Sequence, residues 1–264
     1  MDAVVIGLAV ILGLVTGSFA NVPIHRWPRG GTVTSPKRSA CPSCEAPIAP
    51  RDNVPVLSWV LLRGRCRHCG APIAARYVLV EATTAILFGL IAWRRGTDPL
   101  VPALLVFAWA LVVATAIDLE HRIIPNRLTY RLPFVLLPLL IVDAGLDGAW
   151  SDLRRGVIWA IGVPAIMFAI AEVFRLLRGQ MGMGDVKLAI SIGLVVGYLG
   201  AIQLAVFAYA TMAASIVVVV GLLAARRARL ASRIPFGPYL AVGALVPILA
   251  PQAGAGLVRR LLGL

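Results

Sequence analysis

A long stretch without charge constrains the fold of this chain more than any other feature. Residues 188–225 contain no Asp, Glu, Lys or Arg. A soluble domain needs polar side chains to cover its surface, yet 59% of this chain is hydrophobic and only 14% is charged. A membrane-spanning helix needs about 20 consecutive apolar residues. The sequence therefore predicts an all-α membrane protein.

Eight apolar segments are candidates for membrane spans. They cover residues 3–24, 77–93, 100–117, 132–148, 156–174, 186–200, 203–224 and 238–257. The fourth is the weakest, because two prolines and Asp143 interrupt it, and the sixth is short. No basic residue precedes the first segment and no clear cleavage site follows it, so we interpret it as a retained span. The expected fold is a bundle of about eight transmembrane helices.

The net charge of +13 is explained by where the basic residues lie. With the N-terminus outside and the segments alternating, six arginines fall outside: Arg94, Arg95, Arg154, Arg155, Arg259 and Arg260. The other 19 of the 25 Lys and Arg residues face the cytoplasm, as the positive-inside bias requires. This distribution needs no nucleic-acid partner, and it would hold the protein against anionic lipids.

The polar segment 25–76 contains all four cysteines, in two pairs separated by 21 residues. Each pair has the spacing C-x-x-C, which lets both thiolates reach one tetrahedral ion, and the ligands are Cys41, Cys44, Cys66 and Cys69. The alternative is two disulfides, but the charge distribution places this loop in the reducing cytoplasm. Four thiolates fill the shell of a structural zinc ion, which leaves His68 as a bystander.

Three domains follow from this pattern. Residues 1–24 form the first transmembrane helix, residues 25–76 a small cytoplasmic zinc-binding domain inserted after it, and residues 77–264 the remaining transmembrane domain. Zinc would supply the stability that so short a loop lacks in its core. We see no internal repeat in the sequence.

Two aspartates lie where apolar segments meet the cytoplasmic face. Asp118 ends the third segment, and Asp185 opens the sixth, directly after Gly182 and Gly184. Ionisable residues at the membrane boundary are costly and point to function. Two neighbouring carboxylates that share one proton can activate water for attack on a peptide carbonyl. The topology places both aspartates on the same side, while their separation does not follow from the sequence.

Other ionisable residues compete for these roles. Glu81 and Glu120 lack the glycine context of the aspartate pair, and Glu172 has the spacing for ion pairs with Arg175 and Arg178. Lys187 either anchors its helix at the headgroups or acts electrostatically on the neighbouring aspartate. We interpret three further acids as solvated residues of an outside loop: Asp143, Asp147 and Asp152.

An ordered set of short motifs resembles the type IV prepilin peptidase family, which also serves the pseudopilins of type II secretion. The motifs cover residues 17–22, 26, 41–44, 52–55, 58–59, 63–66, 76–77, 81, 118–126, 182–185 and 234–239. A lone G-x-G-D is a weak signal, but this ordered set extends over almost the whole chain and is highly specific.

The resemblance implies an aspartic endopeptidase of the bacterial inner membrane, with Asp118 and Asp185 as the catalytic pair. Such enzymes cut the basic leader from prepilins or pseudopilins at the cytoplasmic face. Many members then methylate the new N-terminus with S-adenosylmethionine, and members with this cysteine-bearing loop are typically bifunctional. The sequence shows no glycine-rich nucleotide loop that would mark the site of the methyl donor.

Two other classes of function remain open from the residues alone. A membrane transporter would use the aspartates in an ion pathway, and the short sixth segment would suit a discontinuous helix. A non-enzymatic assembly scaffold would use the zinc-binding loop to dock partners. Cleavage of a pilin leader, abolished by substitution of either aspartate, separates the peptidase from both.

Overall fold

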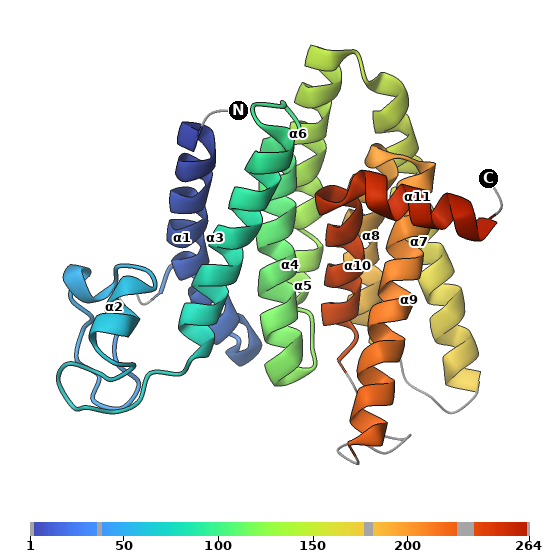
Figure 1. The fold of residues 1–264 in the computed structure, drawn as a ribbon. Helices are drawn as coiled ribbons and strands as arrows, with labels where there is room; N and C mark the ends of the chain where they lie inside the picture. Colours follow the sequence, from blue (N-terminus) through green and yellow to red (C-terminus); the bar gives the residue numbers. More distant parts are fainter. Residues whose placement is uncertain (1–2, 36–38, 177–181, 226–234, 263–264) are drawn as a thin grey trace. The chain divides into compact units, whose positions relative to one another are not determined.

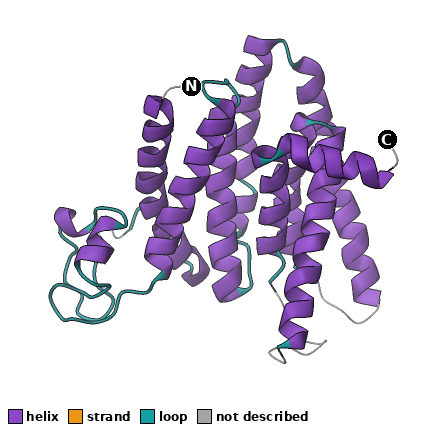
Figure 2. Ribbon diagram, in the orientation of Figure 1, coloured by secondary structure: helices purple, strands orange, loops and turns teal. Residues whose placement is uncertain are grey.

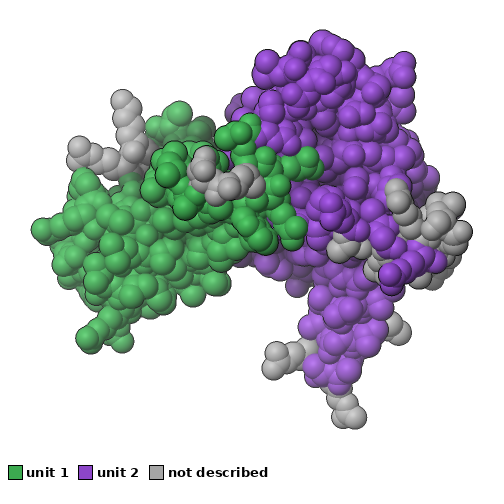
Figure 3. All heavy atoms as spheres, turned by 45° about the horizontal axis from the view of Figure 1, so that its top comes forward, with its two compact units in different colours: residues 1–97 green, residues 98–264 purple. Residues whose placement is uncertain are grey.

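The computed structural model describes residues 3–35, 39–176, 182–225 and 235–262. Within these ranges the regular structure is helical apart from two isolated β-bridges (Figure 2). Six of the described helices are long and apolar enough to cross a membrane. The chain divides into two compact units, residues 1–97 and residues 98–264, which Figure 3 colours separately. The predicted all-α membrane fold is confirmed at this level.

Unit 1 is built on two long helices, α1 (Ala3–Arg26) and α3 (Arg76–Arg95), that pack against each other (Figure 1). Two glycines of α1, one helical turn apart, make this packing close. A Cβ on Gly13 would lie 2.6 Å from the Cα of Ala85, and one on Gly17 would lie 2.9 Å from the Cα of Glu81. Small residues at this spacing let helix backbones approach directly in membrane proteins.

The cysteine-bearing segment lies between these two helices in the chain. It contains the short helices η1 (Trp27–Arg29), η2 (Pro50–Asp52) and α2 (Leu57–Leu61), and most of its remaining described residues are turns. The predicted zinc-binding domain, residues 25–76, therefore falls wholly within unit 1.

Unit 2 contains eight helices in its described residues. They are α4 (Val101–His121), α5 (Asn126–Thr129), α6 (Leu132–Asp147), α7 (Trp150–Leu176), α8 (Met183–Leu199), α9 (Ala201–Ala224), α10 (Gly237–Leu249) and α11 (Pro251–Leu262). The apolar helix α8 is buried along most of its length, because α4, α6, α7, α9 and α10 all pack against it. Its contact with α7 depends on glycine: a Cβ on Gly156 would lie 2.6 Å from the carbonyl oxygen of Leu194.

Six of the eight predicted spans correspond to the helices of spanning length. The predicted span 186–200 corresponds to α8, which has 17 residues. The predicted span 238–257 is divided into α10 and α11, because α10 ends at Leu249 and Pro251 begins the next helix. The number of eight transmembrane helices therefore stays a prediction.

The interpretation of Asp143 as a solvated loop residue is wrong. Asp143 belongs to α6 and its side chain is buried. Its carboxylate accepts a hydrogen bond from the hydroxyl of Tyr198, near the end of α8. Asp147 is exposed, and Asp152 forms an ion pair with Arg155 at 3.0 Å. The sequence places Asp143 near a helix end, but it does not reveal that a tyrosine 55 positions later faces the same carboxylate.

Candidate active site and metal centre

Asp118 lies in the last turn of α4 and is buried, with 5% of its surface exposed. Its Oδ2 accepts a hydrogen bond of 2.8 Å from the backbone N–H of Gly237, the first residue of α10. A Cβ on Gly237 would lie 2.9 Å from the same oxygen. Glycine at this position lets the α10 backbone reach the carboxylate directly, so the side chain of Asp118 is held from a distant part of the chain.

Asp185 lies in the first turn of α8 and is also buried, with 6% of its surface exposed. Its Oδ1 has no hydrogen-bond partner among the described residues. A Cβ on Gly182 would lie 2.9 Å from its Oδ2, and a Cβ on Gly184 would lie 3.0 Å from the Cβ of Ile124. Both predicted glycines therefore stand where a side chain would crowd the carboxylate or the segment packed beside it.

The structure brings the two aspartates together within unit 2. Asp118 repels Asp185 electrostatically, and the helices α4 and α8 that carry them pack against each other. The two side chains come from segments far apart in sequence, the end of one helix and the start of another. Two buried carboxylates in one site are the arrangement that shares a proton and activates water.

Lys187 supports the same region without pointing at the aspartate two positions before it. Residues two apart on a helix point in different directions. The Nζ of Lys187 donates a 2.8 Å hydrogen bond to Oδ1 of Asn126 and lies 5.0 Å from the ring centroid of Tyr130. It thus joins α8 to the segment that follows Asp118. Glu172 pairs with Arg175 at 2.7 Å, as predicted, while Arg178 lies outside the described residues.

The four cysteines of unit 1 converge on one point. Their Sγ atoms all lie within 4.8 Å of one another, and the Sγ atoms of Cys41 and Cys69 are 3.9 Å apart. A tetrahedral zinc ion with bonds of about 2.3 Å places its sulfur ligands about 3.8 Å apart, whereas a disulfide needs about 2.05 Å. All four thiols are free. The cluster therefore fits a four-cysteine zinc site, with zinc supplying a structural cross-link when bound.

The cysteine pairs form two knuckles of the same design, which the sequence reading missed. In each knuckle the first cysteine N–H donates to the carbonyl five residues later, from Cys41 to Ala46 and from Cys66 to Ala71. Each also has a β-bridge from the residue before that cysteine to a proline, and its fifth residue has a positive φ. The shared pattern C-x-x-C-x-A-P-I, at residues 41–48 and 66–73, is a short internal repeat.

Backbone groups in the first knuckle favour the thiolate. N–H groups of Ser43 and Cys44 donate to the sulfur of Cys41 and lower its pKa to about 6. A deprotonated sulfur is the form that binds a metal.

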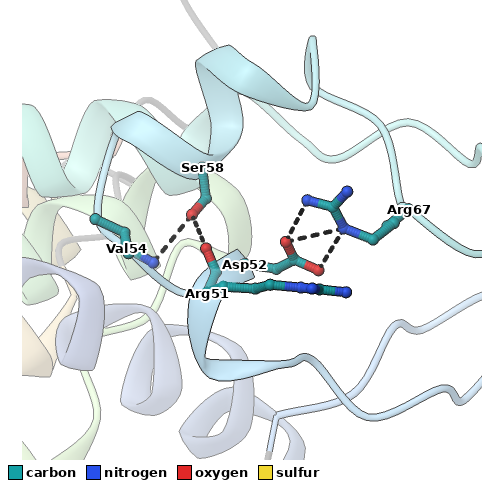
Figure 4. A network of polar contacts seen from close by, with 5 residues as sticks. All are labelled: Arg51, Asp52, Val54, Ser58 and Arg67. Carbon is teal, nitrogen blue, oxygen red and sulfur yellow. Dashed lines mark hydrogen bonds and ion pairs between the residues drawn. The ribbon is translucent and has the colours of Figure 1, made fainter.

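The loop between the knuckles is tied down by a polar network (Figure 4). Arg67, from the second knuckle, donates to both carboxylate oxygens of Asp52 at 2.7–3.0 Å. The hydroxyl of Ser58 donates to the carbonyl of Arg51 and accepts from the N–H of Val54, both at 3.0 Å. These contacts connect η2, α2 and the second cysteine pair, so they hold the segment between the two knuckles in place.

Glu81 connects this loop to helix α3. It is buried, and its Oε2 accepts a hydrogen bond of 2.6 Å from the backbone N–H of Val56. Val56 has a φ of 61°, a conformation that is costly for a β-branched residue. The sequence showed a glutamate near the start of a span. Nothing in the sequence around Glu81 indicated that its carboxylate would be buried against a loop residue 25 positions earlier.

Comparisons with known proteins agree with this architecture. Residues 11–95 match the bacterial peptidase A24 N-terminal domain, and residues 105–224 match the type IV leader peptidase family. No solved structure matches the chain.

Relatives of the chain carry the name prepilin leader peptidase/N-methyltransferase, and three of them are compared here. The protein from Aeromonas hydrophila is 35% identical over 92% of this chain and 89% of its own length. The one from Neisseria gonorrhoeae is 34% identical over 89% and 87%, and the one from Burkholderia pseudomallei (strain 1026b) is 36% identical over 90% and 83%. With matches of this extent, the chain belongs to the type IV leader peptidase family.

Proposed function

We propose that this chain is a membrane endopeptidase that removes the leader peptide from prepilins or pseudopilins and then methylates the new N-terminus. The observation that carries the proposal is the pair of buried, mutually repelling carboxylates, Asp118 and Asp185, at the junction of α4 and α8. Family membership and the names of the relatives supply the substrate class. They do not favour the transporter alternative.

The two aspartates would carry out hydrolysis without forming a covalent bond between the enzyme and the substrate. One carboxylate takes a proton from water as the water oxygen attacks the scissile carbonyl carbon, and the protonated partner donates to the carbonyl oxygen. Collapse of the tetrahedral intermediate breaks the C–N bond, and the amine leaves with a proton returned by the pair. The Gly237 N–H would keep Asp118 oriented throughout.

The zinc-binding domain would have a structural role in this enzyme. Cys41, Cys44, Cys66 and Cys69 provide four sulfur ligands, which leaves no open position for a substrate or an attacking water. Zinc would therefore stabilise the loop, and hydrolysis would belong to the aspartates.

The proposed location is the bacterial inner membrane, with the N-terminus outside and both the zinc-binding domain and the aspartates at the cytoplasmic face. The supporting observation is the charge distribution of the sequence, which puts most basic residues in the inner loops. Those residues would also attract anionic lipids.

The test is cleavage of a prepilin peptide by the purified full-length enzyme, with the N-terminus of the product read by mass spectrometry. We expect cleavage by the wild type and loss of at least about a hundredfold in rate for Asp118→Asn and for Asp185→Asn. Glu172→Gln, which removes an acid from an exposed ion pair, serves as the matched control and should cleave normally. Cleavage by the double Asp→Asn variant at the wild-type rate would refute the catalytic assignment.

A further inference from the structure

Two tyrosines are buried in the described part of unit 2, and only one of them has a partner for its hydroxyl. Tyr198 is 4% exposed and donates its hydroxyl hydrogen to the carboxylate of Asp143. Tyr239 is 9% exposed, and its hydroxyl forms no hydrogen bond with any residue that the structure describes. A buried hydroxyl without a partner costs free energy, and phenylalanine would fill the same space without that cost. Packing alone therefore does not explain a tyrosine at position 239.

Tyr239 is the third residue of α10, the helix whose first residue contacts Asp118. The N–H of Gly237 donates to Oδ2 of Asp118 at 2.8 Å, so the N-terminal end of α10 meets the carboxylate. Helical side chains lean toward the N-terminus of their own helix, and the Tyr239 side chain therefore extends toward the end where Asp118 lies. In agreement, the charge of Asp118 acts electrostatically on the Tyr239 hydroxyl.

The helix that carries Tyr239 is placed against both aspartate-bearing helices. α10 packs against α4, which ends near Asp118, and against α8, which begins near Asp185 (Figure 1). Three segments far apart in sequence thus meet at the catalytic pair, and α10 is the one that adds a phenol.

Phe236 holds the ring of Tyr239 in one orientation. The two rings are arranged edge to face, with centroids 6.0 Å apart and planes at 67°. The backbone N–H of Tyr239 also donates to the carbonyl of Phe236 at 3.1 Å. A donor that is fixed before the substrate arrives needs no reorganisation during the reaction, which is the condition for effective stabilisation of a transition state.

The catalytic pair has an open acceptor that complements this open donor. Oδ1 of Asp185 is buried and has no hydrogen-bond partner in the described residues. A water molecule can donate to this oxygen, and a peptide carbonyl can accept from the hydroxyl of Tyr239. The resting site thus offers one unoccupied group to the attacking water and one to the scissile carbonyl.

We infer that Tyr239 is a third catalytic group, whose hydroxyl donates a hydrogen bond to the oxygen of the scissile carbonyl as that oxygen becomes negatively charged. This inference rests on the proposed peptidase function and adds a residue to its mechanism. The tyrosine keeps its proton: the protonated aspartate supplies the proton, and the phenol adds a second hydrogen bond to the same oxygen. The bonds formed and broken in hydrolysis are unchanged. A tyrosine that only tuned Asp118 would already hydrogen-bond it in the resting protein.

Tyr239→Phe removes the hydroxyl and keeps the ring. The purified full-length variant in detergent should cleave the prepilin peptide with a kcat lowered by about a hundredfold, the usual effect of losing one donor to an oxyanion. KM should hardly change, because the lost hydrogen bond forms in the transition state. Tyr209→Phe, at a half-buried tyrosine of α9, is the matched control and should cleave like the wild type. A wild-type kcat in Tyr239→Phe, or a rise in KM alone, would overturn the inference.

Two further readouts separate a catalytic role from a structural one. Tyr239→Phe should unfold at the wild-type temperature, because its hydroxyl has no described partner in the resting protein. The pH dependence of its kcat should keep the wild-type shape, since the two aspartates remain in place. A clearly lower unfolding temperature would assign the hydroxyl a structural role instead. A displaced pH profile with the maximal rate retained would mean that it acts on Asp118, and either result contradicts the inference.

A tetrahedral analogue tests the contact directly. A difluoroketone version of the prepilin peptide hydrates to a diol that resembles the intermediate, and it should bind Tyr239→Phe about a hundredfold more weakly than the wild type. The cleaved leader peptide, which has no tetrahedral centre, should bind both equally. Equal affinity of the diol for both proteins would exclude the contact. If the wild type does not cleave the prepilin peptide at all, the proposed function fails; if the wild type and Tyr239→Phe cleave equally well, only the role of Tyr239 fails.

Discussion

Replacing Gly237 by alanine tests how far the geometry of one backbone group controls the catalytic pair. The new Cβ would lie 2.9 Å from Oδ2 of Asp118 and 3.3 Å from its Cβ and Cγ. Ordinary contacts are longer by about half an ångström, so the carboxylate or the start of α10 must shift. The shift weakens a hydrogen bond of 2.8 Å to a charged acceptor, a type worth about 1.5–3 kcal/mol.

The expected consequence is a loss of rate without a loss of fold. A catalytic group displaced by less than 1 Å costs roughly tenfold to a hundredfold in kcat, and KM for the prepilin peptide should change little. Gly237 has no positive φ, so alanine adds no backbone strain at the start of α10 and thermal stability should not fall by much.

Steady-state cleavage and thermal unfolding, measured together on the same preparations, separate these effects. The control is Gly145→Ala in α6, where an added Cβ meets nothing within 4 Å. It should cleave at the wild-type rate. If Gly237→Ala also keeps the wild-type kcat, the contact between α10 and Asp118 does not position the carboxylate, and the reasoning fails.

Three further predictions concern groups outside the catalytic pair. Glu45 has a φ of 58° at the position where the second knuckle has Gly70, and a non-glycine residue in this conformation costs about 1 kcal/mol. Glu45→Gly should therefore raise the zinc affinity by roughly fivefold in a competition titration. The converse variant, Gly70→Glu, should lower the zinc affinity. Tyr198→Phe should lower the free energy of unfolding by about 1–3 kcal/mol in thermal melts, because it removes a hydroxyl that donates to buried Asp143. Tyr209, a half-buried residue of α9, serves as the control, and Tyr209→Phe should have no comparable effect. The Arg67 hydrogen bond holds the pKa of Asp52 below its ordinary value of 3.8, so the pair stabilises the loop above pH 3.8 and this stabilisation is lost as the pH falls through the lowered pKa. Carbon NMR of the Asp52 carboxylate should give a titration midpoint below 3.8 that rises in Arg67→Gln. An unchanged midpoint in that variant would contradict the pairing.

The parts of the site that were predictable depend on residue type and short spacing. Two C-x-x-C pairs predict a cluster, because a tight knuckle brings both thiols of a pair to one side regardless of what surrounds it. Long apolar segments predict helices, because hydrocarbon demands that each backbone group is bonded within its own segment. The structure places the four sulfurs within 4.8 Å of one another and gives six helices of spanning length.

The parts that were not predictable depend on contacts between distant segments. The Gly237 N–H reaches Asp118 across 119 positions of sequence, and Tyr198 reaches Asp143 across 55. No local pattern marks either pair, so Asp143 was read as solvated. The knuckle repeat is different, since Ala-Pro-Ile follows both cysteine pairs at the same distance and could have been found by comparing residues 41–48 with 66–73.

The packing of helix α8 shows how unit 2 accommodates the buried carboxylate of Asp185. At about 1.5 Å per residue, its 17 residues extend about 25 Å, which is shorter than the hydrocarbon core of about 30 Å. The helix is surrounded by other helices along most of its length, and Asp185 is buried among them although Met183, two residues before it, is 51% exposed. Asp185 in the first turn therefore avoids the hydrocarbon that would make its charge prohibitive. The glycines at 182 and 184 then leave the space beside the carboxylate that bulkier residues would fill, and a water and a peptide bond need that space.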